Sequence, residues 1–535
     1  MISCPGCGGN IKFDISSQKM KCEYCQNLYD PYDFDSKTKD AEENVSQTED
    51  FEVTIFSCPQ CGGEILSTDN AAAGFCSFCG ASTILYSRIS HEKRPDFIIP
   101  FSKTKEDCKQ SYAALMRKSI FAPNELKNPE YIDGFRGIYM PYWAFYITQK
   151  GELNLPAEKS YRRGDYVYTD HYQLEGFMDS YYKGISYDAS SSFSDNISQS
   201  VAPFDVKGMK AFTPGFMSGF YADTADVDAW VYQSDAEAIA LNQSLKDIEK
   251  IDAYKGVTIK TSKAGGNSEQ KRLFTKTETI DRALFPVWFM SYRNKDRVAY
   301  VTINGQTGKV AADIPVEPKK YLLGSLILAI PFFFLLMMFT ILPKYLMAIG
   351  GALALFASIL YTSELSSIAK KDSFATDKGM LFLKNPAQAA QMQAKSPINI
   401  KRKKSPIVSA IFIVLCIQVG VSVLIPILSQ VKTLISFVWP ILVIGMVIVF
   451  AIGSKKMSAI PDSQSILGYI ASSLAIILGA AITFFNPVYD IFYYIGTIFS
   501  LVSVALAFVD IIRYYNVLVT RQLPQFNKMG GDDRA

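Results

Sequence analysis

The C-terminal part of the chain holds six apolar stretches separated by polar connections. Each is close to the ~20 residues that cross the hydrocarbon core of a bilayer, and besides hydroxyl groups their interiors offer Gln418, with Asp510 near the end of the last stretch. The stretches are 321–342, 345–361, 407–428, 433–452, 466–485 and 489–512. A soluble core rarely uses six such runs in succession, so residues 319–513 are predicted to form a six-helix α-helical transmembrane domain.

Lysine and arginine residues are distributed unequally over the connections between these stretches. The connection 363–405 holds nine of them, whereas those on the other side hold only Lys344 and Lys432. Because basic connections stay in the cytoplasm, we predict a multi-pass protein of the inner (plasma) membrane with both termini, including the tail 514–535, in the cytoplasm. The basic run next to the third stretch predicts contact with anionic lipid headgroups, or it is a topology signal alone. This run consists of Lys401, Arg402, Lys403 and Lys404.

The preceding region, residues 91–318, mixes helix and strand patterns and is not apolar enough to insert. This pattern predicts a cytoplasmic α+β domain. Thr104, with Asp107 three residues later, predicts the start of a helix that ends before the next proline. Ser234 and Glu237 form a capping box and predict the start of a second helix.

Strand patterns occupy much of the rest of this domain. Tyrosines alternate over residues 161–187, which predicts strands. Residues 140–146 are similar to residues 285–292: both hold Pro-x-Trp followed by aromatic residues, and each predicts a strand that starts at its proline. The second leads through a turn at 304–309 into a further strand that continues towards the membrane domain. The turn has two residues between its glycines where a phosphate-binding loop needs four, so a hairpin turn is predicted.

Eight of the ten cysteines form four Cys-x-x-Cys pairs in two sets. The second set repeats the first with a shift of 54 positions, and 14 residues separate the inner cysteines of each set. This spacing is close to that of four-cysteine zinc sites, and two such turns close a tetrahedral site. We therefore predict two small β zinc ribbons with structural Zn²⁺, at 1–35 and 51–90, joined by a flexible acidic linker at 36–50. The predicted ligands are Cys4, Cys7, Cys22, Cys25, Cys58, Cys61, Cys76 and Cys79.

Disulfides and redox catalysis are the competing interpretations of these pairs. Redox catalysis would use one pair in a βαβ unit, and disulfides would need an oxidising compartment, whereas Met1 opens directly into the first motif without a signal peptide. Each zinc site has four ligands and no open position, so catalysis at the metal is not expected. Cys108 and Cys416 lie outside the sets and are predicted to be buried. We expect serine at Cys58 and Cys61 to unfold the second ribbon alone.

The charge balance limits the possible ligands. The chain has 54 lysines and arginines against 51 acidic residues, a net charge of +3, which is not the composition of a strongly basic nucleic-acid binder. Residues 1–90 hold thirteen acidic and six basic residues, so the ribbons have the wrong sign for phosphate contacts. The ribbons are therefore expected to contact protein.

No catalytic constellation is apparent in the sequence. Asp223, Asp226 and Asp228 lack the spacing and the glycine of a calcium loop. His91 and His171 are the two histidines of the chain, and no nucleophile motif accompanies His171. The apolar stretches also lack the buried ionisable groups that mark transport pathways. We predict that the protein is not an enzyme.

Several segments resemble a family of bacterial membrane proteins with N-terminal TFIIB-type zinc ribbons. The resemblance covers roughly residues 1–320 and rests on the doubled ribbons and on segments 97–101, 137–145, 212–222 and 284–309. Other members of this family resemble the membrane partners of phage-shock-type and SPFH (flotillin-like) envelope-stress proteins. The resemblance implies an anchoring or scaffold role with such partners.

Together these features predict a non-enzymatic polytopic membrane scaffold or adaptor. Its ribbons and α+β domain would recruit partner proteins to the bilayer, and the resemblance implies that they do so in an envelope-stress response. A transporter or channel with regulatory ribbons is the first alternative. A membrane-tethered nucleic-acid-binding protein is the second.

Overall fold

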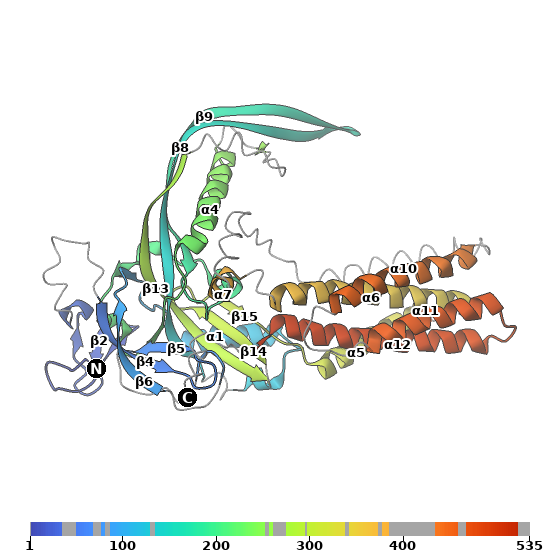
Figure 1. Ribbon diagram of the computed structural model, residues 1–535, viewed down its shortest axis with the longest axis horizontal. Helices are drawn as coiled ribbons and strands as arrows, with labels where there is room; N and C mark the ends of the chain where they lie inside the picture. The colour runs from blue at the N-terminus through green and yellow to red at the C-terminus, as the bar shows by residue number, and fades with distance from the viewer. Residues whose placement is uncertain are drawn as a thin grey trace.

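The computed structural model consists of a small N-terminal sheet, a large central sheet flanked by helices, and a C-terminal helical bundle that extends away from the sheets (Figure 1). The described residues are 2–34, 50–67, 76–80, 86–128, 134–251, 256–259, 274–294, 297–336, 342–372, 377–384, 434–457 and 467–522. The predicted linker up to residue 49, the basic run at 401–404, the third apolar stretch and Cys416 lie outside these residues.

The small sheet contains three antiparallel strands in the order β1-β2-β3. They are β1 (Ile11–Asp14), β2 (Lys19–Cys22) and β3 (Leu28–Tyr29), and the short 3-10 helix η1 (Pro31–Phe34) follows them. Apolar and polar positions alternate along β1 and β2, so Ile11, Phe13 and Met20 lie buried on one face. Together with its cysteines we call this unit the first ribbon.

The large sheet contains thirteen strands, in the path β10-β7-β13-β8-β11-β5-β4-β6 with further strands beside it. The strands are β4 (Asp50–Ser57), β5 (Glu64–Ser67), β6 (Tyr86–Lys93), β7 (Phe97–Ile98), β8 (Arg136–Arg163), β9 (Tyr166–Asp188), β10 (Lys210–Ala211), β11 (Tyr221–Asp223), β12 (Thr258–Ile259), β13 (Phe274–Asn294), β14 (Arg297–Asn304), β15 (Val310–Ala312) and β16 (Arg521–Gln522). Strands β4, β5 and β6 belong to the predicted second ribbon, which is thus continuous with the central sheet.

The two Pro-x-Trp segments pair with each other at the centre of this sheet. Strands β8 and β13 are antiparallel, with Met140 opposite Phe285. The prolines lie inside these strands, so the prediction that a strand starts at each proline is wrong. On the side of β8 that faces away from β13, the paired strand changes from β11 to β9 at Pro141. On the side of β13 that faces away from β8, the paired strand changes from β7 to β14 at Pro286. A residue without an N–H is tolerated there because no ladder hydrogen bond is lost.

Helix α1 (Lys105–Lys118) confirms the first predicted helix. Thr104 caps it through a reciprocal capping box with Asp107. Helix α4 (Trp230–Glu249) begins before Ser234, so the predicted capping box is wrong. The buried side chains of Val231 and Tyr232 hold the first turn against the sheet, and this packing replaces a side-chain cap. A shorter helix, α3 (Asp195–Val201), precedes α4.

The bundle contains the helices α5 (Pro318–Leu336), α6 (Pro343–Asp372), α10 (Leu434–Met457), α11 (Leu467–Phe485) and α12 (Ile491–Val519). Three helical segments of the described residues are long and apolar enough to cross a membrane: Pro343–Ser363, Leu467–Phe485 and Ile491–Val519. Val438–Gly453 is a shorter apolar helix. The second, fifth and sixth predicted stretches are thus confirmed as membrane-length helices.

Asp510 is not at the end of its helix, as the apolar pattern suggested, because α12 continues to Val519. Its side chain is buried, and its carboxylate accepts the backbone N–H of Gly468 over 2.9 Å. Gly468 lies in the first turn of α11, where backbone N–H groups lack helical partners. The carboxylate of Asp510 therefore caps a neighbouring helix.

The bundle is attached to the sheet by hydrogen bonds at its near end. The side chain of Asn516 bonds to both backbone groups of Val316, and the guanidinium of Arg297 donates to the carbonyl oxygens of Val517 and Thr520. The helix α7 (Lys378–Lys384) lies within the predicted basic connection, and the ammonium of Lys378 forms a buried ion pair with Asp235 of α4. The central domain thus holds both the end of α12 and part of this connection.

Candidate metal centres

All four Cys-x-x-Cys pairs form the same turn. The residue after the second cysteine donates its N–H to the carbonyl oxygen of the first, over 2.8 Å at Cys4, 3.2 Å at Cys22, 2.8 Å at Cys58 and 3.0 Å at Cys76. This residue has a positive φ each time: Gly8 (73°), Gln26 (62°), Gly62 (71°) and Gly80 (70°). Glycine adopts such angles without steric cost, which explains the residue type at three of the four turns.

These turns bring the sulfur atoms of each set together. The Sγ–Sγ distances are 3.6 Å for Cys4–Cys25, 3.4 Å for Cys7–Cys22, 3.8 Å for Cys58–Cys79 and 3.7 Å for Cys61–Cys76. Within each set all four sulfur atoms lie within 4.8 Å of one another. Four zinc–sulfur bonds of about 2.3 Å in a tetrahedron place sulfur atoms about 3.8 Å apart, whereas a disulfide requires about 2.05 Å. Both sets can therefore hold a metal ion.

The protonation of the thiols fits metal binding. The hydroxyl of Tyr29 lies 3.5 Å from Sγ of Cys4 and lowers the pKa of this thiol to about 6. In the second set, hydrogen bonds from Cys61 and then from Cys76 and Cys79 lower the pKa of Cys58, while the pKa of Cys61 is raised. Since thiolates are the ligands of a metal, a metal ion held by either set would replace these shared protons. Tyr29 was not among the predicted site residues, because its contact depends on the pairing of β3 with β2.

The two centres differ in their surroundings. In the first ribbon Cys4 and Cys22 are buried, but Cys7 is exposed and Cys25 is partly exposed. In the second set all four cysteines are buried, in a cluster with Phe56 and Ile65. The first centre thus lies at the surface, whereas the second lies in the interior of the domain.

The same difference appears at the tip of the second Cys-x-x-Cys turn in each set. Tyr24 and Phe78 occupy equivalent positions, 54 residues apart. Tyr24 is 76% exposed, whereas Phe78 is 1% exposed. The ring of Phe78 packs on Phe289, with centroids 6.2 Å apart, and its carbonyl oxygen accepts a 2.7 Å hydrogen bond from the hydroxyl of Tyr300. The central sheet therefore covers one aromatic tip and leaves the other at the surface.

One segment of the chain contacts both ribbons, and we call residues 211–223 the bridging segment. The Ser218 hydroxyl donates to the carbonyl oxygen of Ile11 over 2.7 Å, and the ring of Phe216 packs on Phe13 at 5.3 Å. A few residues later, β11 pairs antiparallel with β5 of the second ribbon. The bridging segment therefore fixes the position of the first ribbon relative to the second.

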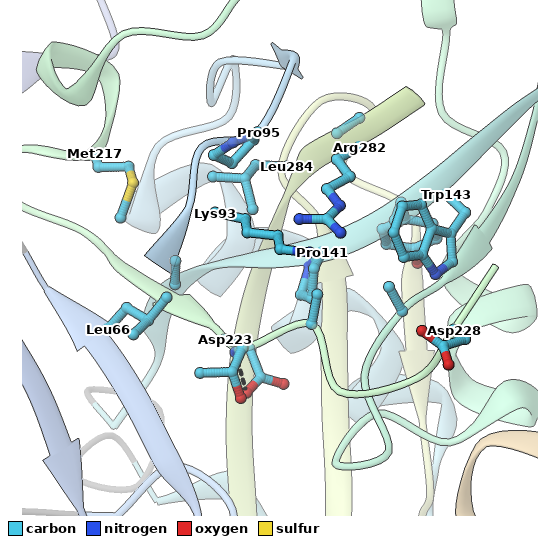
Figure 2. Close-up of a pocket in the computed structure, with 16 residues that line it drawn as sticks. Leu66, Lys93, Pro95, Pro141, Trp143, Met217, Asp223, Asp228, Arg282 and Leu284 are labelled. Atoms are coloured by element: carbon cyan, nitrogen blue, oxygen red, sulfur yellow. Dashed lines mark hydrogen bonds between the residues drawn. The ribbon is translucent and has the colours of Figure 1, made fainter. Parts of the chain in front are cut away.

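A pocket of about 470 Å³ lies beside the bridging segment. Figure 2 shows Lys93 and Arg282 on one side of it and Asp223 and Asp228 on the other. The guanidinium of Arg282 lies 5.1 Å from the ring centre of Trp143. Burial raises the pKa of Asp223 to about 7, and two serine hydroxyls donate to its carboxylate. Arg282 and Asp223 are therefore occupied by contacts within the protein.

The remaining candidate residues do not assemble into a further centre. Asp226 accepts hydrogen bonds from Ser191, and Asp223 is bonded elsewhere. Cys108, a residue of α1, is buried as predicted, and burial raises its pKa to about 12. Nδ1 of His171 lies 3.4 Å from a carboxylate oxygen of Glu158 on an exposed hairpin. In the described part of the chain, only the two cysteine sets gather three or more potential metal ligands.

Comparison with known proteins gives one distant relative. The chain is 26% identical over 322 residues to an uncharacterized protein of Bacillus subtilis strain 168, YdjG; the match covers 59% of this chain and 90% of that protein. Neither a protein-family model nor a solved structure matches the chain. The match thus spans most of the relative, whose name indicates no activity for this chain.

Proposed function

We propose that the protein is a non-enzymatic membrane adaptor that recruits a partner protein to the bilayer through the first ribbon. Structural Zn²⁺ stabilises the fold of both ribbons, since a unit of about 30 residues cannot bury enough core to fold without a bound metal. The apolar helices embed the chain in the inner membrane, with the sheets on the cytoplasmic side. By its family resemblance, the partner is an SPFH-type or phage-shock-type stress protein.

The exposed tip of the first ribbon is the observation that carries this proposal. Tyr24 lies at the surface at the position where the second ribbon buries Phe78 in the domain. Leu28, close to it on β3, is exposed as well. Exposed aromatic anchors are typical of protein contact sites, and tyrosine is enriched among the residues that dominate binding energy.

The shape of the molecule agrees with an adaptor. The first ribbon lies at the end of the molecule opposite the far end of the bundle (Figure 1). A partner bound at Tyr24 would thus be held away from the bilayer surface. The bundle offers little support for transport, because Asp510, the buried carboxylate of α12, is used in capping α11.

Affinity isolation of the full chain from membranes in mild detergent, followed by quantitative mass spectrometry, tests the proposal. Tyr24→Ser removes the exposed ring without touching a ligand. Ile239→Ser, at an exposed apolar position on α4, is the matched control. We expect a stress-type partner with wild type and the control but a strong loss with Tyr24→Ser. Equal recovery with all three proteins would contradict recruitment through the first ribbon.

A further inference from the structure

The hairpin of β8 and β9 extends far beyond the sheet from which it arises. Its two strands stay paired from Tyr142 and Asp188 up to Arg163 and Tyr166, where Gly164 takes a positive φ in the turn. Helix α4 covers the hairpin near the sheet, where Leu155 and Leu174 are buried. Beyond α4, both strands are exposed from residue 159 to residue 173. A two-stranded ribbon of this kind is at best marginally stable in water.

The two faces of this exposed ribbon differ in chemistry. Residues opposite each other in the register share a face. On one face Tyr161 pairs with Tyr168, with stacked rings 5.7 Å apart, and Arg163 pairs with Tyr166, which is 73% exposed. Tyr172 lies on the same face. This tyrosine face continues the face that α4 covers closer to the sheet, so nothing in the described chain covers its outer half.

The opposite face is more polar, although it exposes Val167 opposite Arg162. Ser160 and Thr169 share a hydrogen bond of 2.9 Å, and His171 lies 3.4 Å from Glu158. The exposed ribbon carries a small positive charge, since residues 159–173 hold Lys159, Arg162 and Arg163 against Asp165 and Asp170. The hairpin therefore ends in tyrosines with basic residues around them.

The hairpin curves so that its tip points along the bundle. Along the direction of the bundle axis in Figure 1, the tip of the hairpin reaches as far as the bundle, whereas the base of the hairpin reaches only as far as the central sheet. If the bundle crosses a bilayer, the near surface of this bilayer meets the tip. Tyrosine, lysine and arginine are the residues that settle at headgroup level, the ring partly buried and the charge near anionic lipid.

We infer that the tip of the β8–β9 hairpin inserts its tyrosine face into the headgroup region of the membrane in which the bundle lies. The ligand is the lipid surface, with anionic headgroups contacting Lys159, Arg162 and Arg163. This second contact fixes the tilt of the central sheet over the bilayer, which a bundle attached at one edge does not do by itself. The inference rests on the membrane location proposed above.

Photocrosslinking in vesicles tests the inference. The full chain is made with p-benzoylphenylalanine at Tyr168 or, as the matched control on the polar face, at Thr169, and is reconstituted into vesicles of phosphatidylcholine and phosphatidylglycerol. After irradiation, mass spectrometry counts the lipid adducts. We expect several-fold more lipid adduct at position 168 than at 169, and a decrease at 168 when phosphatidylglycerol is omitted.

Flotation of the vesicles distinguishes a failure of the proposed membrane location from a failure of the proposed hairpin contact. A chain that does not float with the vesicles refutes the membrane location itself. A chain that floats but gives equal lipid adducts at both positions, or gives only protein adducts at 168, overturns the hairpin contact alone. A second measurement is cleavage by trypsin after Arg163 in these vesicles. We expect it to be slow in wild type and several-fold faster after Tyr161→Ser, Tyr166→Ser and Tyr168→Ser are combined, and equal rates would also overturn the inference.

Discussion

The two ribbons share one motif but use it in opposite ways. Their cysteines repeat with a shift of 54 residues, and their turns have the same hydrogen bonds and the same positive φ angles. The first ribbon has its own three-stranded sheet, and its aromatic tip, Tyr24, lies at the surface. The second ribbon pairs β4 and β5 with the central sheet and buries Phe78 in it.

This difference shows that a metal motif determines the local turn but not its role. In the second ribbon the four cysteines are buried in the domain, so a metal ion held there would stabilise the central sheet. In the first ribbon the four cysteines belong to a peripheral unit whose tip lies at the surface. The expectation that loss of Cys58 and Cys61 affects the second ribbon alone does not fit a sheet that runs through β5 into β11.

Removal of two cysteine ligands should give the largest difference between the two ribbons in their effect on the stability of the central sheet. We expect Cys58→Ser with Cys61→Ser to unfold the central sheet, because the zinc contribution is on the order of 10 kcal/mol and a domain is stable by about 5–15 kcal/mol. Cys4→Ser with Cys7→Ser should unfold the first ribbon and leave the sheet intact. Hydrogen exchange of β8 and β13 in the full chain measures both. Protected strands in both variants would show that the second centre is as peripheral as the first.

Substitution of the aromatic residue at the tip of each ribbon should give a smaller difference in the free energy of unfolding. Phe78→Ala should cost about 3–5 kcal/mol, because it opens a cavity beside Phe289. Tyr24→Ala should change stability by less than about 0.5 kcal/mol, as for other exposed positions. Pulse proteolysis in increasing urea measures both free energies of unfolding. A large effect of Tyr24→Ala would mean that its ring stabilises the fold and is not simply an exposed contact residue.

Zinc should leave the two centres at different rates. A colorimetric chelator reaches the exposed Cys7 directly, whereas the second centre must open first, so we expect two phases that differ by about tenfold or more. The fast phase should be missing from Cys4→Ser with Cys7→Ser. A single phase for two equivalents of zinc would contradict the difference in accessibility.

The smallest effect concerns the contact between the first ribbon and the bridging segment. Ser218→Ala removes the hydrogen bond to the carbonyl oxygen of Ile11 and should weaken the docking by about 1–2 kcal/mol. Hydrogen exchange at the amide of Phe13, which donates to the carbonyl oxygen of Ser218, reports this loss. Ser111→Ala, on the exposed side of α1, is the control. Unchanged exchange would place the docking energy in the aromatic contacts.

Local patterns in the sequence were sufficient to find the two four-cysteine groups and three membrane-length apolar helices. A Cys-x-x-Cys-Gly turn is specified within five residues, and a helix of about 20 apolar residues needs no distant partner to be recognised. The cap at Thr104 is equally local and is confirmed. By contrast, Ser234 and Glu237 satisfy the same local rule, yet the packing of Val231 and Tyr232 starts the helix earlier.

The roles of the two ribbons depend on partners far along the chain. Strand β5 pairs with β11, and Ser218 binds Ile11, so burial of one centre and docking of the other depend on a segment that carries no cysteine. Asp510 shows the same limit, since its partner Gly468 belongs to another helix. The net negative charge of residues 1–90 argues against nucleic acid but does not reveal which ribbon faces outward.

A two-residue strand near the end of the chain completes the central sheet late in synthesis. Strand β16 pairs with β14, opposite Arg297 and Val298, and it follows α12 in the chain. The ribosome therefore makes this strand only after the last apolar helix of the bundle. Until then the outer part of β14 lacks this neighbour, so the central sheet is complete only once the bundle has been made. A chain arrested within the bundle would show quality-control proteases an open sheet edge.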